Sequence, residues 1–266
     1  MNRLLLFLLF ALHFVIYIDS LYFKRRLRGI IWTNKSKRTT DLLANIRDKL
    51  SLNFDLCIQG YHLVNGDPAK ESVWENLNEQ IFVESGCHVA SKSSGSHSPG
   101  SDITCALGNI SNKSAKYESD RGTFNISSYR LTTMCSGLNC GNIDEIIHGI
   151  NSKKNFQYYS IIVREETGEK YKYDWYLIPS DHPAFDPASY DWIPTIGQRG
   201  QNKAKQVGWR TNSVDGSSMS ISFSMSSQLW ISICVTEDLK KHIVGSSISS
   251  KDTRFNYMQL HKLLEK

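Results

Sequence analysis

Asp102 and Lys113 are two residues of opposite charge that stand close together in a Ser- and Asn-rich stretch of this chain. Hydrolysis of a phosphodiester needs a carboxylate that holds Mg²⁺ against the phosphate. It also needs a cation that orients the attacking water and neutralises developing charge. An aspartate and a lysine brought to one place supply both functions. This pair therefore predicts metal-assisted hydrolysis, provided that the local structure brings the two side chains together.

The segment between these two residues is typical of a β-hairpin. Pro99 and Gly100 predict a turn before Asp102, and the run 103–107 predicts a strand. Gly108–Asn109 matches a two-residue hairpin turn, after which 110–114 is expected to return as the second strand. Such a hairpin carries Lys113 back towards Asp102.

Side-chain alternation on the second strand places Ser111 and Lys113 on one face. The segment resembles the core of the PD-(D/E)XK nuclease superfamily, and the whole chain resembles a type II restriction endonuclease. In that family an aspartate soon after a proline begins one strand, and an acidic-x-Lys triplet lies on the next. Here Ser111 occupies the usual acidic position, and its hydroxyl is a weaker Mg²⁺ ligand than a carboxylate. A second register, with Lys116 as the lysine, remains open.

The resemblance implies that a glutamate on the helix before the first core strand completes the metal site. The segment Glu71–Phe82 has apolar residues at helical spacing, which predicts an amphipathic helix. Glu75 and Glu79 lie on this helix, and Glu75 best matches the family position. We therefore expect Asp102 to bind Mg²⁺ with help from Glu75 or Glu79, although each glutamate also suits a solvated helix face.

The resemblance implies a particular fold and a particular activity. The fold class is α/β, with a restriction-endonuclease-like central mixed sheet flanked by helices and extra C-terminal strands. The expected activity is Mg²⁺-dependent, site-specific cleavage of double-stranded DNA that leaves 5′-phosphate ends. A palindromic target implies a homodimer, and a restriction enzyme implies a companion DNA methyltransferase. The expected location is the cytoplasm.

Several polar residues are candidates for DNA contacts. The run 123–133 predicts a strand, and a phosphate role is suggested for its Ser127, Ser128 and Arg130. The loop 198–203 carries residue types that contact base edges. A half-exposed strand and a surface loop without contacts are the alternatives. The complete list of candidate DNA contacts is His97, Lys116, Ser127, Ser128, Arg130, Arg199, Gln201, Asn202 and Lys203.

Other periodic segments predict the elements that position these residues. Apolar spacing predicts helices over 39–50, 142–153 and 257–264. Strands are expected over 83–90, 158–164, 170–179, 218–225 and 228–235, and 142–153 is expected to be a crossover helix. The domain prediction is an N-terminal segment 1–38, a nuclease core 39–180, and C-terminal strands and recognition loops 181–266, all of 39–266 in one domain.

Composition sets broad limits on the class of protein. The net charge of +5 suits a polyanionic partner without identifying one. None of the six cysteines has the CxxC spacing of a zinc or redox motif, which favours reduced thiols and argues against Zn²⁺. The chain contains no Walker motif, so ATP dependence is not expected.

The N-terminus favours a different class. Leu4 to Ile18 is apolar apart from His13, as in a signal-peptide core or a short anchor. Three interpretations remain open: an anchor or signal, a buried helix, or an upstream extension. Asn-x-Ser triplets at Asn34, Asn109, Asn112 and Asn125 are glycosylation candidates if the chain is secreted. The alternatives are thus a secreted or membrane-anchored glycoprotein without catalytic activity, and a repair nuclease with the same fold.

Overall fold

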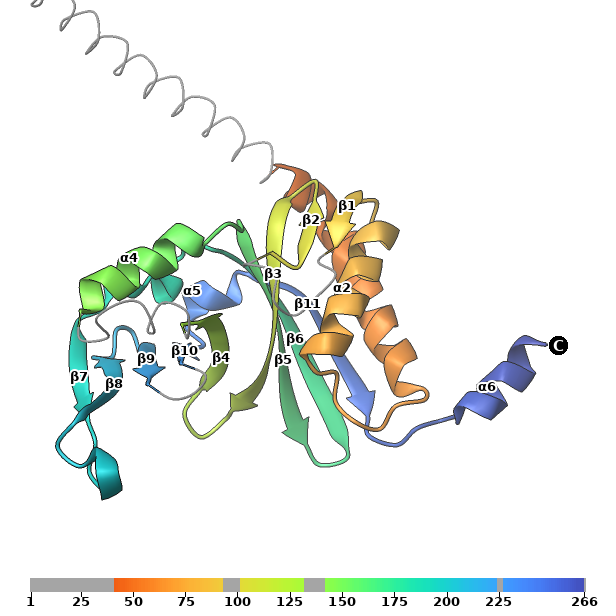
Figure 1. Cartoon of the computed structure of the whole chain (residues 1–266). Helices are drawn as coiled ribbons and strands as arrows, with labels where there is room; N and C mark the ends of the chain where they lie inside the picture. Colours follow the sequence, from red (N-terminus) through yellow and green to blue (C-terminus); the bar gives the residue numbers. More distant parts are fainter. Residues whose placement is uncertain (1–40, 93–100, 132–141, 224–226, 266) are drawn as a thin grey trace, which may run out of the picture. The chain divides into compact units, whose positions relative to one another are not determined.

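The computed structural model describes residues 41–92, 101–131, 142–223 and 227–265 (Figure 1). The chain divides into two compact units, 1–45 and 46–266, and the sheet and the candidate site belong to the second. The N-terminal apolar run and the basic residues that follow it lie outside the described residues, as does His97.

One large sheet dominates the described part of the second unit. Its main strand order is β11-β6-β5-β3-β4-β10-β9-β8-β7; β2 also pairs with β3, and β1 with β2. Only β3 and β5 run parallel, and the other pairs described are antiparallel. The strands are β1 Val89–Lys92, β2 Ile103–Cys105, β3 Gly108–Glu118, β4 Thr123–Arg130, β5 Tyr158–Thr167, β6 Lys170–Pro179, β7 Trp192–Ile196, β8 Gln206–Thr211, β9 Ser218–Ser222, β10 Gln228–Cys234 and β11 Ile243–Ser250.

Helices flank this sheet. Residues 41–62 are helical, and the other helices are α2 Glu71–Glu84, α4 Ile143–Lys153, α5 Glu237–Lys240 and α6 Tyr257–Leu264. Local chemistry sets their starts: the Asn142 side chain accepts from the first backbone N–H groups of α4, and Asn256 forms a capping box with Gln259 at α6. The structure therefore confirms the coarse prediction of an α/β protein with helices on a mixed sheet.

The two faces of β5 pack against different layers. Tyr159, Ile161 and Val163 join a core that also contains apolar residues of β4, β9, β10 and α4. The side chain of Ser160, which lies between them in sequence, meets α2 instead. On the α2 side, buried aromatic rings of the 41–62 helix, α2 and β6 pack edge to face and tilted; these rings are Phe54, Trp74, Phe82 and Trp175.

Most of the predicted elements are confirmed, among them α2, α4, α6, β4, β5, β6, β9 and β10. α4 lies in the connection between the parallel strands β3 and β5, as expected of a crossover helix. The helix expected over 39–50 continues to residue 62. β7, β8, β11 and α5 were not predicted, because short strands such as Trp192–Ile196 show no clean apolar alternation.

Two local predictions were wrong. The strand expected over 83–90 is partly helix, since α2 continues to Glu84 and β1 begins only at Val89. The hairpin turn lies at Ala106–Leu107 and not at Gly108–Asn109. Gly108 instead opens β3 opposite Cys105, where its φ of +116° is one that glycine adopts readily.

Candidate active site

Asp102 is held against β3 by its backbone and its side chain. Its backbone N–H donates to the carbonyl of Ile110 at 2.9 Å, so the chain is already paired with β3 before β2 begins. Its carboxylate accepts from the backbone N–H of Asn112 at 2.6 Å and from the Ser111 hydroxyl at 3.4 Å. The carboxylate is thereby fixed at one point along the edge of β3.

Lys113 lies at the same point. Its Nζ donates to the carbonyl oxygen of Asn112 and to Oε1 of Glu71, each at 2.7 Å. The lysine side chain is only 13% exposed, whereas Glu71 is 42% exposed at the start of α2. The ammonium group is therefore largely enclosed, and a carboxylate open to solvent reaches it from the helix.

Among the described residues, the stretch of β3 at this site is paired on one side only. β5 pairs with Ile110–Lys116 along one edge. On the other edge, pairing with β2 ends at Ile110 and pairing with β4 begins at Tyr117. In the stretch between them, the N–H of Asn112 donates to the Asp102 carboxylate and the C=O of Asn112 accepts from the Lys113 ammonium. These two backbone groups therefore bind side chains of the site and not a neighbouring strand. The gap in the sheet is what leaves backbone groups available for the site.

The charges of the site act on one another. Burial raises the pKa of the Asp102 carboxyl above its ordinary value, and the negative charge of Glu71 adds to this rise. The Lys113 ammonium and the hydrogen bonds from Asn112 and Ser111 lower the same pKa and offset part of the effect. The two carboxylates repel each other, and a single ammonium group lies beside them. Binding of a further cation at this site is therefore electrostatically favourable.

The sequence prediction located three members of this site and missed one. Asp102, Ser111 and Lys113 do come together, on β3 and directly before β2. The carboxylate that contacts Lys113 belongs to Glu71 and not to the predicted Glu75. Glu71 lies one helical turn before Glu75, so the same apolar spacing that located the helix contained a signal for it.

We compared the chain with protein-family models, curated proteins and solved structures. Nothing matches.

The metal site has partial support from its donor set. Among the described residues no group of three or more His, Cys, Asp or Glu side chains is placed to hold a metal ion. Asp102 and Glu71 still provide two carboxylates near one ammonium group, and hard oxygen donors of this kind suit Mg²⁺, which is commonly held by one or two carboxylates with water. The predicted Glu75 and Glu79 lie half-buried on the same helix.

The candidate DNA contacts fall in different surroundings. Lys116 is exposed and pairs with Glu166 at 3.5 Å, and Ser127 is half-buried on β4. The hydroxyl of Ser128 instead forms a hydrogen bond with the hydroxyl of the buried Tyr159 at 3.0 Å. Its hydrogen bond is thus made to the protein core and not at the surface. The side chain of Arg130 lies outside the described residues, and the four candidates Arg199, Gln201, Asn202 and Lys203 are exposed between β7 and β8.

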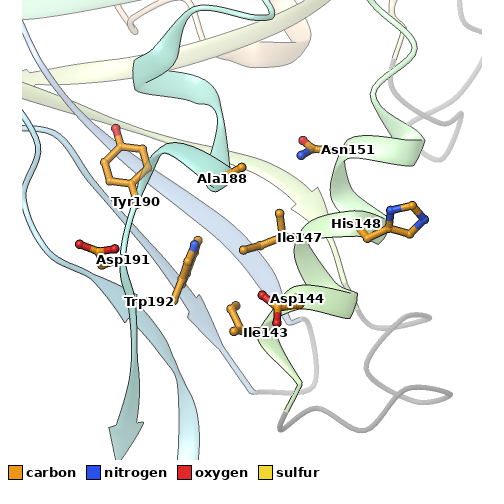
Figure 2. Close-up of a pocket in the computed structure, with 9 residues that line it drawn as sticks. All are labelled: Ile143, Asp144, Ile147, His148, Asn151, Ala188, Tyr190, Asp191 and Trp192. Carbon is orange, nitrogen blue, oxygen red and sulfur yellow. The ribbon is translucent and has the colours of Figure 1, made fainter.

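A separate groove of about 560 Å³ lies between α4 and the segment that leads into β7. Figure 2 shows Ile143 and Ile147 of α4 facing Trp192, with Asp144 and Asp191 at the margins. The site residues Asp102, Glu71 and Lys113 do not line it. No helix in the described ranges has the length and apolar character needed to cross a membrane.

Proposed function

We propose that this chain is a Mg²⁺-dependent DNA endonuclease with a restriction-endonuclease-like core. One observation carries the proposal: the Asp102 carboxylate and the Lys113 ammonium are both bound to the backbone of Asn112, at the one-sided stretch of β3. Glu71 brings a second carboxylate to the ammonium group. A carboxylate pair beside a lysine is one combination that can catalyse phosphodiester hydrolysis, because it provides metal ligands and a cation at the same place.

Each residue has a defined role in this proposal. Asp102 and Glu71 would hold the Mg²⁺ ion, which lowers the pKa of bound water and neutralises charge on the phosphate when it is present. Lys113 orients the attacking water and stabilises negative charge as it develops on the phosphate oxygens. Ser111 and the Asn112 N–H fix the Asp102 carboxylate through the hydrogen bonds described above.

The expected substrate is double-stranded DNA that is cut at specific sites to leave 5′-phosphate ends. The net charge of +5 is favourable for a polyanion, and the exposed Arg199 and Lys203 suit contact with DNA. A homodimer, a companion methyltransferase and a cytoplasmic location belong to the same proposal. Sequencing the ends from one digested plasmid distinguishes a restriction enzyme, which gives discrete fragments, from a repair nuclease.

One of the four Asn-x-Ser triplets is not a glycosylation site in the folded protein. Asn112, which begins one of the Asn-x-Ser triplets, has no exposed side-chain surface, and its carboxamide contacts Asn78 inside the protein. A glycan on this residue is incompatible with the folded structure. Cys57, Cys87, Cys105 and Cys234 are free cysteines in the structure, and the side chains of Cys87 and Cys105 are hydrogen-bonded to each other.

The deciding experiment incubates the purified full chain with supercoiled plasmid, with and without Mg²⁺. We expect cleavage with Mg²⁺, and its loss in Asp102→Asn and in Lys113→Ala. Asp120→Asn and Lys170→Ala change the same residue types at exposed positions and should cleave like the wild type. Circular dichroism checks that each variant is folded. Absence of Mg²⁺-dependent cleavage by the wild type, or full activity of a folded Asp102→Asn, would reject the proposal.

A further inference from the structure

The strands β4, β10, β9 and β8 bury one face and expose the other. Ile126, Ile231, Ile221 and Trp209 of these strands point into the core. Alternation sends the neighbouring side chains to the opposite face, where Trp230 of β10 is 44% exposed. The indole of Trp230 is therefore open to solvent on a face of the sheet that carries mostly small polar side chains.

Strand register places Trp230 in a row of side chains that crosses the sheet. Trp230 pairs with Ser220 of β9 and, on its other side, with Ser127 of β4. Ser220 pairs with Arg210 of β8, which in turn pairs with Ile193 of β7. Directly paired residues share a face, so these side chains form one continuous row. We call the surface made by Ile193, Arg210, Ser220, Trp230 and Ser127 the Trp230 face.

No described helix packs on the Trp230 face. Ile146 and Ile150 of α4 and Leu239 of α5 belong to the core on the opposite side of these strands. α2 and the 41–62 helix cover the part of the sheet made by β3, β5, β6 and β11, as their aromatic and hydrogen-bond contacts show (Figure 1). The described chain therefore leaves this part of the sheet bare.

The Trp230 face is on the same side of the sheet as α2. Tyr117 of β3 pairs with Phe124 of β4, and both pack on the core side. Alternation then places Asn112 on the opposite side, where it meets Asn78 of α2, and places Ser127 of β4 there too. The Trp230 face and α2, the helix that carries Glu71, thus lie on the same side of the sheet.

We propose that the Trp230 face binds unpaired DNA, with a nucleobase stacked on Trp230 and a phosphate bound by Arg210. This inference rests on the proposed nuclease function and assigns the face to single-stranded segments, such as the ends that cleavage leaves, and not to the double-stranded cleavage site itself. An exposed aromatic ring can stack on any nucleobase, and a nearby arginine attracts the phosphate backbone of the DNA. Arg210 is exposed and pairs with no carboxylate among the described residues, so its charge is available to a phosphate.

The composition of the face favours nucleic acid over a second copy of this chain. Serine hydroxyls surround the ring at Ser127, Ser220 and Ser222, and they donate hydrogen bonds to phosphates without repelling them. Stable dimer interfaces need a more apolar centre than one tryptophan and Ile193 provide. The face therefore suits a polar, anionic ligand with exposed rings.

Binding is measured with the full-length Asp102→Asn protein, which keeps the substrate intact. The probes are a fluorescein-labelled single-stranded oligonucleotide and the corresponding duplex, followed by anisotropy at several salt concentrations. We expect Trp230→Ala to weaken single-strand binding roughly tenfold or more, because the base then loses the ring on which it stacks. Trp230→Phe should retain most of the affinity. Arg210→Ala should weaken binding and reduce its salt dependence.

Ile248→Ala is the matched control, since Ile248 is 57% exposed on β11, outside the Trp230 face. Unchanged single-strand affinity in Trp230→Ala overturns the inference, even if the wild type cleaves DNA. Loss of affinity in Trp230→Ala supports it, even if the wild type fails to cleave and the proposed function is rejected. Sedimentation that shows a dimer dissociated by Trp230→Ala, without a change in DNA affinity, assigns the face to a second copy instead.

Discussion

The side-chain amide of Asn78 on α2 donates to the carboxamide oxygen of Asn112 on β3, and both residues are fully buried. The same amide donates to the Ser160 hydroxyl at 2.8 Å, which also accepts from the indole of Trp175 at 2.9 Å. Asn112 in turn binds Asp102 and Lys113 through its backbone. The helix that carries Glu71 is thus connected to the strand that carries the lysine by a polar contact inside the protein.

Replacing Asn78 by Ala removes this connection. Asn112 and Ser160 then keep buried polar groups without that partner, and we expect a loss of about 1–3 kcal/mol in the free energy of unfolding. Because α2 also positions Glu71, the rate constant of cleavage should fall more than the affinity for DNA. Urea unfolding and single-turnover cleavage measure the two effects. Asn76→Ala, on the exposed face of α2, should change stability by less than about 0.5 kcal/mol.

Glu71→Gln should impair cleavage more than Glu79→Gln. The carboxylate of Glu71 contacts the Lys113 ammonium at 2.7 Å, and its loss removes both a charge partner and a proposed metal ligand. We expect a decrease of at least about 10–100-fold, the range typical for partners that only support a metal ligand. Initial rates of plasmid nicking over a range of Mg²⁺ concentrations provide the measurement. A larger decrease in Glu75→Gln or Glu79→Gln would return the role to the glutamates expected from the family resemblance.

Asp102→Asn should stabilise the protein at neutral pH while it abolishes cleavage. Burial raises the pKa of Asp102, so the folded state holds the proton more tightly than the unfolded chain. The free energy of unfolding of the wild type consequently falls as the pH rises from the ordinary aspartate pKa through the raised pKa of Asp102. Above that pKa the destabilisation is complete and does not change further. The asparagine has no such penalty, so the difference between the two proteins should shrink as the pH is lowered towards the ordinary aspartate value. Urea unfolding from acid to neutral pH tests this, with the exposed Asp120→Asn as the control.

Gly108→Ala should destabilise the protein by about 1–3 kcal/mol, in the range typical of a strained backbone position. Gly108 has φ of +116°, and an added Cβ would lie 2.5 Å from Oε1 of Gln157. That oxygen accepts from the Asn109 N–H at 2.6 Å, so its displacement also weakens the start of β3. Gly168 has a positive φ of +56° but open space around it. Gly168→Ala should therefore cost less in thermal or urea unfolding, and an equal cost would remove the steric explanation.

Periodicity was sufficient to locate many of the elements. α4 follows from isoleucines at helical spacing, and β4 from alternation that places Phe124 and Ile126 on the core side. The Asp102 to Lys113 segment was recognisable because both residues belong to one local hairpin, whose geometry depends on neighbours in sequence. Even there the turn was misplaced, since Gly108 takes its positive φ in the first residue of β3 and not within the turn.

Contacts between distant segments were not accessible in this way. Apolar spacing shows that α2 has a buried face, but the glutamate that reaches Lys113 depends on how the helix lies on β3, and Glu71 is the one that does. The one-sided stretch of β3 and the row that joins Ser127, Trp230 and Arg210 result from strand register across the sheet. Local patterns specify which side of an element is apolar, whereas packing between elements sets which polar groups meet.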